Sequence, residues 1–209
     1  MTAIRCGRPR KGEEAFRRDL LLDRAMSLFA EHGYGALSLE TIARQAHVSL
    51  RTIYRQFGSK AQLFGAVIQR ISDEFVARLP QDASRPIAEV LEEFGYQFLS
   101  RITRPETLRL RAQILAEAQR FPELAAEFYR RGPECTLTHL SRLLAEYQRA
   151  GVVAELDSRF LAGQFLAALC GEWLRKLELG LVAPPGPSTL QEQVKQAVNL
   201  FLRGCLACA

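Results

Sequence analysis

The chain has 209 residues, 48% of them hydrophobic, which is enough for a folded core and argues against a disordered protein. No stretch reaches the ~18 to 20 uninterrupted apolar residues of a membrane span, and no apolar run of a signal peptide follows the basic N-terminus, so we expect a cytoplasmic protein with no membrane partner. The net charge of +5 comes from residues 1–60, which hold 11 Lys or Arg and 6 Asp or Glu, so this part is expected to bind a polyanion, unless it is only a solvated basic tail.

The chain begins with a polar segment that is followed by a helical pattern. Residues 1–14 contain Gly7, Pro9 and Gly12, so a flexible basic arm is expected there. From residue 16 apolar side chains recur at the spacing of one helix face, and Gly33 and Gly35 end the pattern. The expected buried face consists of Phe16, Leu20, Leu21, Ala25, Leu28 and Phe29.

Two short helices with a tight break between them come next. Ser38 is a suitable N-cap for the first helix and Ser49 for the second, which ends before Gly58. Two short amphipathic helices joined by a break at residues 47–48 form the core of a helix-turn-helix. The outward side chains of the second helix are suited to base edges and phosphates, although a solvated surface helix could carry the same types. These residues are Arg51, Thr52, Tyr54, Arg55 and Gln56.

The rest of the chain is expected to form longer helices. Ser59 caps a helix that runs to about residue 79. Further helices are expected over residues 86–102, 105–120, 122–149 with a break at Gly132-Pro133, 157–179 and 188–206. No strand alternation and no internal repeat is found. We therefore predict an all-α fold with a flexible arm at 1–14, a three-helix DNA-binding domain at 15–62, and a larger helical ligand-binding and dimerisation domain at 63–209.

Residues 37–60, with the sequence LSLETIARQAHVSLRTIYRQFGSK, resemble the signature of the tetracycline-repressor (TetR) family. The resemblance implies a homodimeric regulator, most simply a repressor, that leaves a palindromic operator when it binds a small effector, and the supply of aromatic residues in the second half of the chain suggests an apolar or aromatic effector. The sequence departs from the family pattern at two positions. His47 stands where glycine is usual, and Gln56 stands where the residue is often aromatic or histidine. The resemblance implies phosphate contacts by Thr41 and Lys60, major-groove contacts by Ser49, Leu50, Arg51 and Thr52, and backbone contacts by Tyr54 and Gln56.

The second half of the chain resembles the ligand domain of AefR-like regulators in Phe121-Pro122-Glu123-Leu124, Phe128-Tyr129 and Gly132-Pro133. Family resemblance implies that helices 157–179 and 188–206 form a four-helix dimer interface, although both could simply be core. Large apolar groups with a few polar ones are typical of a ligand pocket, with ordinary packing as the alternative for each. The candidates are Phe98, Gln113, Phe128, His139 and Trp173.

The arm has a motif of its own. The segment Gly7-Arg8-Pro9-Arg10-Lys11 resembles an AT-hook core. Arginine side chains favour narrow A·T-rich minor grooves because the potential there is more negative. Arg8, Arg10 and Lys11 are therefore predicted to bind DNA, with an incidental basic tail as the alternative.

Five scattered cysteines, an odd number, indicate thiols rather than a disulfide framework. The terminal CxxC has no second ligand pair, so neither a metal nor another cofactor is expected. The sequence contains no phosphate loop, metal-ligand cluster or nucleophile–base signature, so we do not expect an enzyme. A redox-sensing regulator, switched by Cys135, Cys170 or the pair Cys205 and Cys208, stays open, as does an architectural DNA-binding protein without an effector.

Overall fold

The computed structural model describes the backbone of residues 11–206 and the side chains of residues 16–206. Within this range the protein is all-α, as predicted, and its only β pairing is an isolated bridge between Val153 and Leu206. None of the helices in this range is long and apolar enough to cross a membrane. The helices are α1 (Lys11–Ala36), α2 (Leu39–Gln45), α3 (Leu50–Phe57), α4 (Lys60–Val76), α5 (Ile87–Ile102), α6 (Pro105–Glu117), α7 (Pro122–Arg131), α8 (Pro133–Arg149), α9 (Ser158–Glu178) and α10 (Pro187–Cys205).

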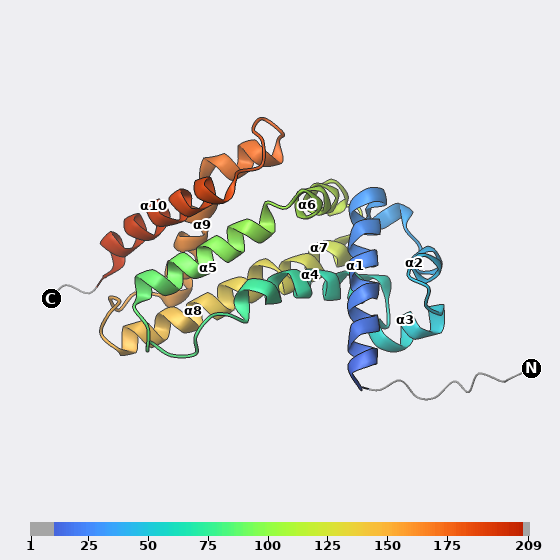
Figure 1. Ribbon diagram of the computed structural model, residues 1–209, viewed down its shortest axis with the longest axis horizontal. Coiled ribbons are helices and arrows are strands. Elements are labelled where there is room, and N and C mark those ends of the chain that lie inside the picture. Colours follow the sequence, from blue (N-terminus) through green and yellow to red (C-terminus); the bar gives the residue numbers. More distant parts are fainter. Residues whose placement is uncertain (1–10, 207–209) are drawn as a thin grey trace, which may run out of the picture.

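Helices α1 to α3 form a head at one end of the molecule, and the body extends away from it (Figure 1). The three N-caps expected from the sequence are confirmed. The hydroxyls of Ser38, Ser49 and Ser59 accept hydrogen bonds from backbone N–H groups three residues later, at 3.1, 3.0 and 3.1 Å. These bonds satisfy N–H groups that have no partner inside the helix, so they fix where each short helix begins.

The first helix differs from the prediction at its N-terminal end. It begins at Lys11, inside the segment expected to be a flexible arm. Gly12 is tolerated there because one glycine costs a helix only about 1 kcal/mol relative to alanine. Phe16 and Leu20, expected on the buried face, are 63% and 52% exposed, because the head core begins only at Leu21. Arg8 and Arg10 lie outside the described residues, and so do Cys6 and Cys208.

The body packs α5 against α10 and α8 against α9 around a second core. Asp157 caps α9 by accepting hydrogen bonds from the N–H groups of Arg159 and Phe160. Phe160 in the first turn of this helix is 60% exposed, whereas its neighbours Leu161 and Ala162 belong to the body core, so Phe160 lies on the outer side of α9. The break at Gly132 is confirmed, since α7 ends and α8 begins there.

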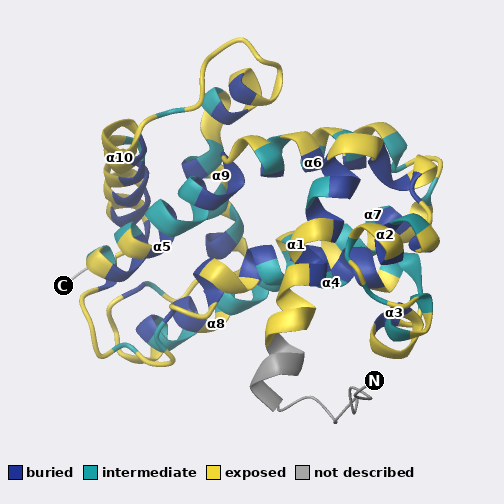
Figure 2. Ribbon diagram, turned by 45° about the vertical axis from the view of Figure 1, so that its right-hand side comes forward, coloured by how far each residue is buried: buried dark blue, intermediate teal, exposed yellow. Residues whose placement is uncertain are grey.

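The two cores meet along α4 and α6. The head core includes α4 as far as Ile71, and Phe75, one turn further on, belongs to the body core. Leu110 and Ile114 of α6 and Leu124 of α7 complete the head core from outside the predicted head. Figure 2 shows the buried sides of α1, α4 and α7 gathered at this junction. The core of the head is therefore formed by its own three helices together with parts of the body.

Candidate DNA-binding surface and ligand pocket

The turn between α2 and α3 has the geometry of a helix-turn-helix. His47 has a positive φ of 53°, which explains why glycine could stand there and why histidine is tolerated. The N–H of Val48 donates to the carbonyl of Ala43 at 3.0 Å and closes the turn. Ile42 and Ile53 are fully buried and hold the two helices together. The sequence therefore orients α3 so that its other side faces solvent.

The solvent side of α3 carries the residues predicted to contact DNA. Arg51, Tyr54, Arg55 and Gln56 are exposed, and Thr52 is half-buried. In the part of the chain that the structure describes, neither Arg51 nor Arg55 has an acidic partner within ion-pair distance. Both cations are thus available to an external anion. A short helix that presents unpaired arginines and hydrogen-bonding groups is suited to phosphates and base edges.

The hydroxyls predicted to contact DNA also have structural roles. Ser49 and Thr52 share a hydrogen bond of 2.7 Å between their side-chain oxygens. Thr41 shares one of 3.1 Å with Ser38. Since a hydroxyl can accept two hydrogen bonds and donate one, these groups keep capacity for a phosphate or a base. Ser49 is exposed and Leu50 half-buried beside them.

Lys60, predicted to hold a phosphate, contacts the head itself. Its Nζ donates to the backbone carbonyls of Tyr34 and Leu37, at 2.7 and 3.0 Å, and lies 4.2 Å above the centre of the Tyr34 ring. Burial lowers the pKa of this amine, while nearby Glu117 and Glu123 act in the opposite direction. Lys60 therefore braces the end of α1 and the residues that follow it, a role the motif did not reveal, and its phosphate contact stays a prediction.

A carboxylate from the body reaches the same segment. Glu117, the last residue of α6, accepts hydrogen bonds from the N–H groups of Tyr34 and Gly35 at 2.5 and 3.0 Å. We call this contact the Glu117 latch. It joins a side chain to backbone N–H groups 82 and 83 residues away, so no local pattern in the sequence could indicate it.

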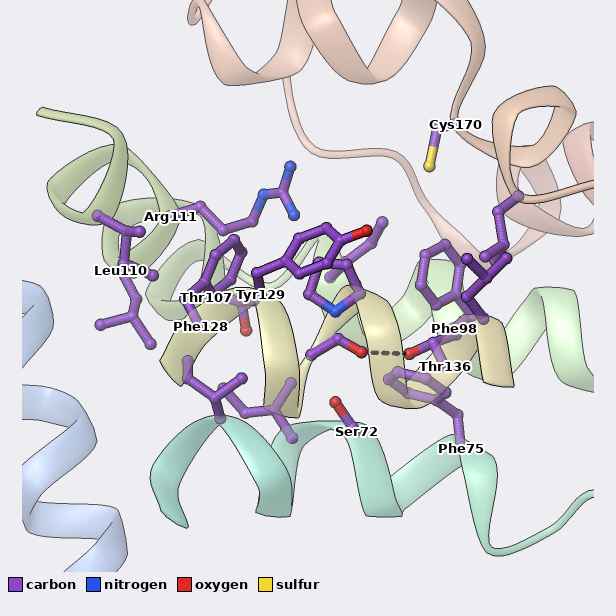
Figure 3. Close-up of a pocket in the computed structure, with 18 of the residues that line it drawn as sticks. Ser72, Phe75, Phe98, Thr107, Leu110, Arg111, Phe128, Tyr129, Thr136 and Cys170 are labelled. Atoms are coloured by element: carbon purple, nitrogen blue, oxygen red, sulfur yellow. Dashed lines mark hydrogen bonds between the residues drawn. The ribbon is translucent and has the colours of Figure 1, made fainter. Parts of the chain in front are cut away.

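An apolar cavity of about 330 Å³ lies between α4, α5, α6, α7, α8 and α9. Its size is at the small end of ligand pockets, which span ~300–1,000 Å³. Figure 3 shows Phe75 and Phe98 together at one end and Leu110, Phe128 and Arg111 at the other. Ser72, Thr107, Tyr129 and Thr136 add hydroxyl groups to this apolar lining. Such a mixture suits a small, largely apolar molecule with few polar atoms.

Two of the five predicted pocket residues line this cavity, namely Phe98 and Phe128. The other three are placed elsewhere. Gln113 lies against Gly33 of the head, His139 bonds to the carbonyl of Cys135 at 2.8 Å, and the Trp173 indole donates to the carbonyl of Leu169 at 3.1 Å. Trp173 borders a separate hollow beside the loop before α10. Residue type alone could not tell which side of each helix faces the cavity.

Two of the described cysteines, Cys170 and Cys205, do not favour thiolate chemistry. Cys170 lines the cavity, and burial raises the pKa of its thiol to about 11. Cys205 is buried, which also raises its pKa. Reactive cysteines usually have a lowered pKa. Among the residues that the structure describes, no cluster of three or more His, Cys, Asp or Glu could hold a metal ion.

A helix-turn-helix whose second helix, α3, exposes arginines without ion-pair partners among the described residues, on a helical body with an apolar cavity, defines a helix-turn-helix transcription regulator. Comparison with known proteins identifies which kind. Residues 21–67 match the family described as bacterial regulatory proteins, tetR family, and residues 89–204 match the AefR-like transcriptional repressor, C-terminal domain. The chain belongs to the TetR family. It is accordingly a DNA-binding transcription regulator and not an enzyme.

Individual relatives agree with this assignment. The HTH-type transcriptional regulator BetI of Rhizobium meliloti is 32% identical over 166 residues, which cover 78% of this chain and 70% of BetI. The repressor ComR of Escherichia coli is 42% identical over 72 residues, about a third of each protein. The structure of the Flavonoid-responsive Regulator FrrA has a TM-score of 0.73 and 31% identity, and the match covers 93% of this chain and all of FrrA.

Proposed function

We propose that this protein is a repressor that binds a palindromic operator as a homodimer and is released when a small apolar effector enters the cavity. One observation carries the proposal. Ile68, Leu110 and Ile114 line the cavity and also belong to the hydrophobic core of the head. Because interiors are closely packed, a ligand that displaces these side chains also disturbs the packing of the head. A bacterial operator is a cytoplasmic target, so the protein is proposed to act there.

The exposed side of α3 supports the DNA half of the proposal. Arg51 and Arg55 are free for DNA, with Tyr54 and Gln56 beside them and Thr41 and Ser49 at the starts of α2 and α3. The remaining proposed contacts are those of Leu50, Thr52 and Lys60. Phosphate contacts would set the position of the head, and contacts to base edges would select the sequence.

Exposed apolar side chains support the dimer. Phe160 of α9 and Leu200 of α10 are 60% and 70% exposed, and the outer side of α10 is largely exposed along its length (Figure 2). These two large side chains stand among exposed polar groups, and apolar groups rimmed by polar ones are typical of an interface. A second copy packed on α9 and α10 would cover them and hold two heads at a fixed separation for two half-sites.

The effector and the DNA would act through linkage. A ligand that binds better to one separation of the heads shifts the population towards it, and operator affinity changes by the same coupling free energy. Two elements connect cavity and head: α4, which passes from one core to the other, and α6, which ends in the Glu117 latch.

The test is binding of the purified protein to the DNA upstream of its own gene, at two salt concentrations and with competitor DNA. We expect saturable binding by a dimer that survives competitor and weakens as salt rises. Complete loss to competitor at every DNA segment tried would favour an architectural protein instead. An increase in operator affinity when an effector is added would contradict release, while leaving DNA binding intact.

A further inference from the structure

The cavity has one charged side chain among the described residues that line it, and this is Arg111 of α6. Its guanidinium points away from α4, to the side of the cavity on which Cys170 of α9 lies (Figure 3). Its ion-pair partner, Glu178, is not part of the lining and comes from the last turn of α9. A cation thus stands at the wall of an otherwise apolar cavity, with its counter-charge outside.

The ion pair leaves part of the guanidinium unused. Nε and Nη2 of Arg111 both donate to the same oxygen, Oε1 of Glu178, at 3.0 and 2.6 Å. No hydrogen bond from Nη1 is found within the part of the chain that the structure describes. A guanidinium has five N–H donors in a planar fork that matches a carboxylate, so Arg111 can bind a second acid, or exchange one for another.

We propose that the effector is a small apolar acid whose carboxylate binds Arg111 in place of Glu178. The inference rests on the proposed function, because it names the chemical class that the cavity takes. The apolar part of the ligand would lie among Phe75, Phe98 and Leu110, and its acid group would reach the guanidinium. No acidic side chain lines the cavity within the described residues, so Glu178, which lies outside the lining, is the carboxylate that the ligand has to replace at Arg111.

The exchange is physically reasonable because the ion pair is not deeply buried. The side chains of Arg111 and Glu178 are 30% and 28% exposed, so the displaced carboxylate can turn into water. A partly exposed ion pair contributes little to stability. The acid would gain the same kind of ion pair and, in addition, the free energy of burying its carbon skeleton in the cavity.

The exchange would also release α6 from α9. The Arg111–Glu178 pair ties the middle of α6 to the end of α9. Glu117 lies six residues further along the same helix, about 9 Å at the usual rise, and holds the head. Loss of the tie would therefore act on the helix that carries the latch.

The experiment measures displacement of phenylnaphthylamine, a neutral fluorescent probe, from the purified protein. Competitors are matched pairs: decanoic acid with decanol, and naphthoic acid with naphthalenemethanol. We expect at least one acid to bind about tenfold or more tightly than its alcohol, since a hydrogen bond to a charged group is worth ~1.5–3 kcal/mol.

Arg111→Gln should abolish this preference and leave the affinity for the alcohol unchanged. Glu178→Gln should strengthen binding of the acid, because the side chain at position 178, which competes with the acid for Arg111, loses its negative charge.

Two further variants make the outcomes distinguishable. Arg109→Gln removes a charge from an exposed position of the same helix and should behave like the wild type. Gly163→Phe fills the cavity from α9, where a Cβ would meet only Leu137 at 4.0 Å, and should abolish probe binding. Failure of the probe to bind, or binding unaffected by Gly163→Phe, would contradict the proposed function of the cavity. Probe binding with no preference for either acid, or a preference that Arg111→Gln preserves, would overturn the acid effector and leave the pocket standing.

Discussion

The carboxylate of Glu117 accepts a 2.5 Å hydrogen bond from the backbone N–H of Tyr34, and so joins the end of α6 to the last turn of α1. The same carboxylate accepts from the N–H of Gly35. Glu117→Gln replaces one acceptor oxygen by a donor, so one of the two N–H groups loses its partner. We expect the change in operator affinity caused by an effector to be severalfold or more smaller in this variant than in the wild type. DNA titrations with and without effector measure this, with the exposed Glu89→Gln as control. An unchanged response would remove Glu117 from the coupling.

Arg51 is predicted to contribute directly to operator binding. Its side chain is exposed on α3 and has no acidic partner among the described residues, so removing it should not affect folding. We expect Arg51→Ala to weaken operator binding by about 1–3 kcal/mol and to relax the preference at one base pair. Binding to a set of single-base operator variants measures both effects. Equal weakening on every variant would indicate a phosphate contact instead.

The basic arm is predicted to add binding that depends strongly on salt. Deletion of residues 1–11 removes Arg8, Arg10 and Lys11. In a plot of the logarithm of the association constant against the logarithm of the salt concentration, each lost phosphate contact should make the slope less steep by about one. The affinity should be measured over a range of salt for both proteins. The arm hypothesis fails if the two slopes are the same.

His47 is predicted to store a small backbone strain. A left-handed conformation costs an L-residue roughly 1–2 kcal/mol, and only glycine adopts it freely. His47→Gly should therefore leave the free energy of unfolding unchanged or raise it by up to about 1 kcal/mol, because glycine gives back part of the gain as chain entropy. His47→Val should lower it by about 1–3 kcal/mol. Denaturant unfolding of the three proteins tests this, and a valine variant as stable as the wild type would contradict it.

The thiol of Cys170 is predicted to be unreactive near neutral pH. Burial raises its pKa to about 11, so the reactive thiolate forms only as pH rises towards that value, and the unfolded chain ionises first. The native state should consequently lose stability between about pH 9 and 11 from this group. Alkylation followed by mass spectrometry should show Cys170 labelled more slowly in the native than in the unfolded protein. Fast reversible oxidation of Cys170 with a change in DNA affinity would restore the redox-sensing hypothesis.

The sequence was sufficient for the features that depend on neighbours along the chain. The caps at Ser38, Ser49 and Ser59 and the break at Gly132 depend on residues within one helical turn, and all four were predicted correctly. The outward side of α3 follows from the helical period once Ile53 is assigned to the core.

Features that depend on distant residues could not be predicted in this way. A periodic face says that a helix side is apolar, but not how far the neighbouring core extends, so Phe16 and Leu20 were assigned to a core that does not reach them. The cavity lies between six helices, and the position of Gln113 or His139 on its own helix does not show whether it faces that space. Arg111 was missed for the same reason, since its importance arises only where α6 and α9 meet.

The shared packing along α4 and α6 has a consequence for how such regulators diversify. Because Leu110, Ile114 and Leu124 complete the core of the head, a new head cannot be exchanged as an independent module. A chimera that joins a foreign residue 1–62 segment to this body would place unmatched side chains against α6 and α7. Changes in the packing of the head and changes in the shape of the cavity must be accommodated by the same apolar side chains, such as Ile68, Leu110 and Ile114, so that selection on one constrains the other.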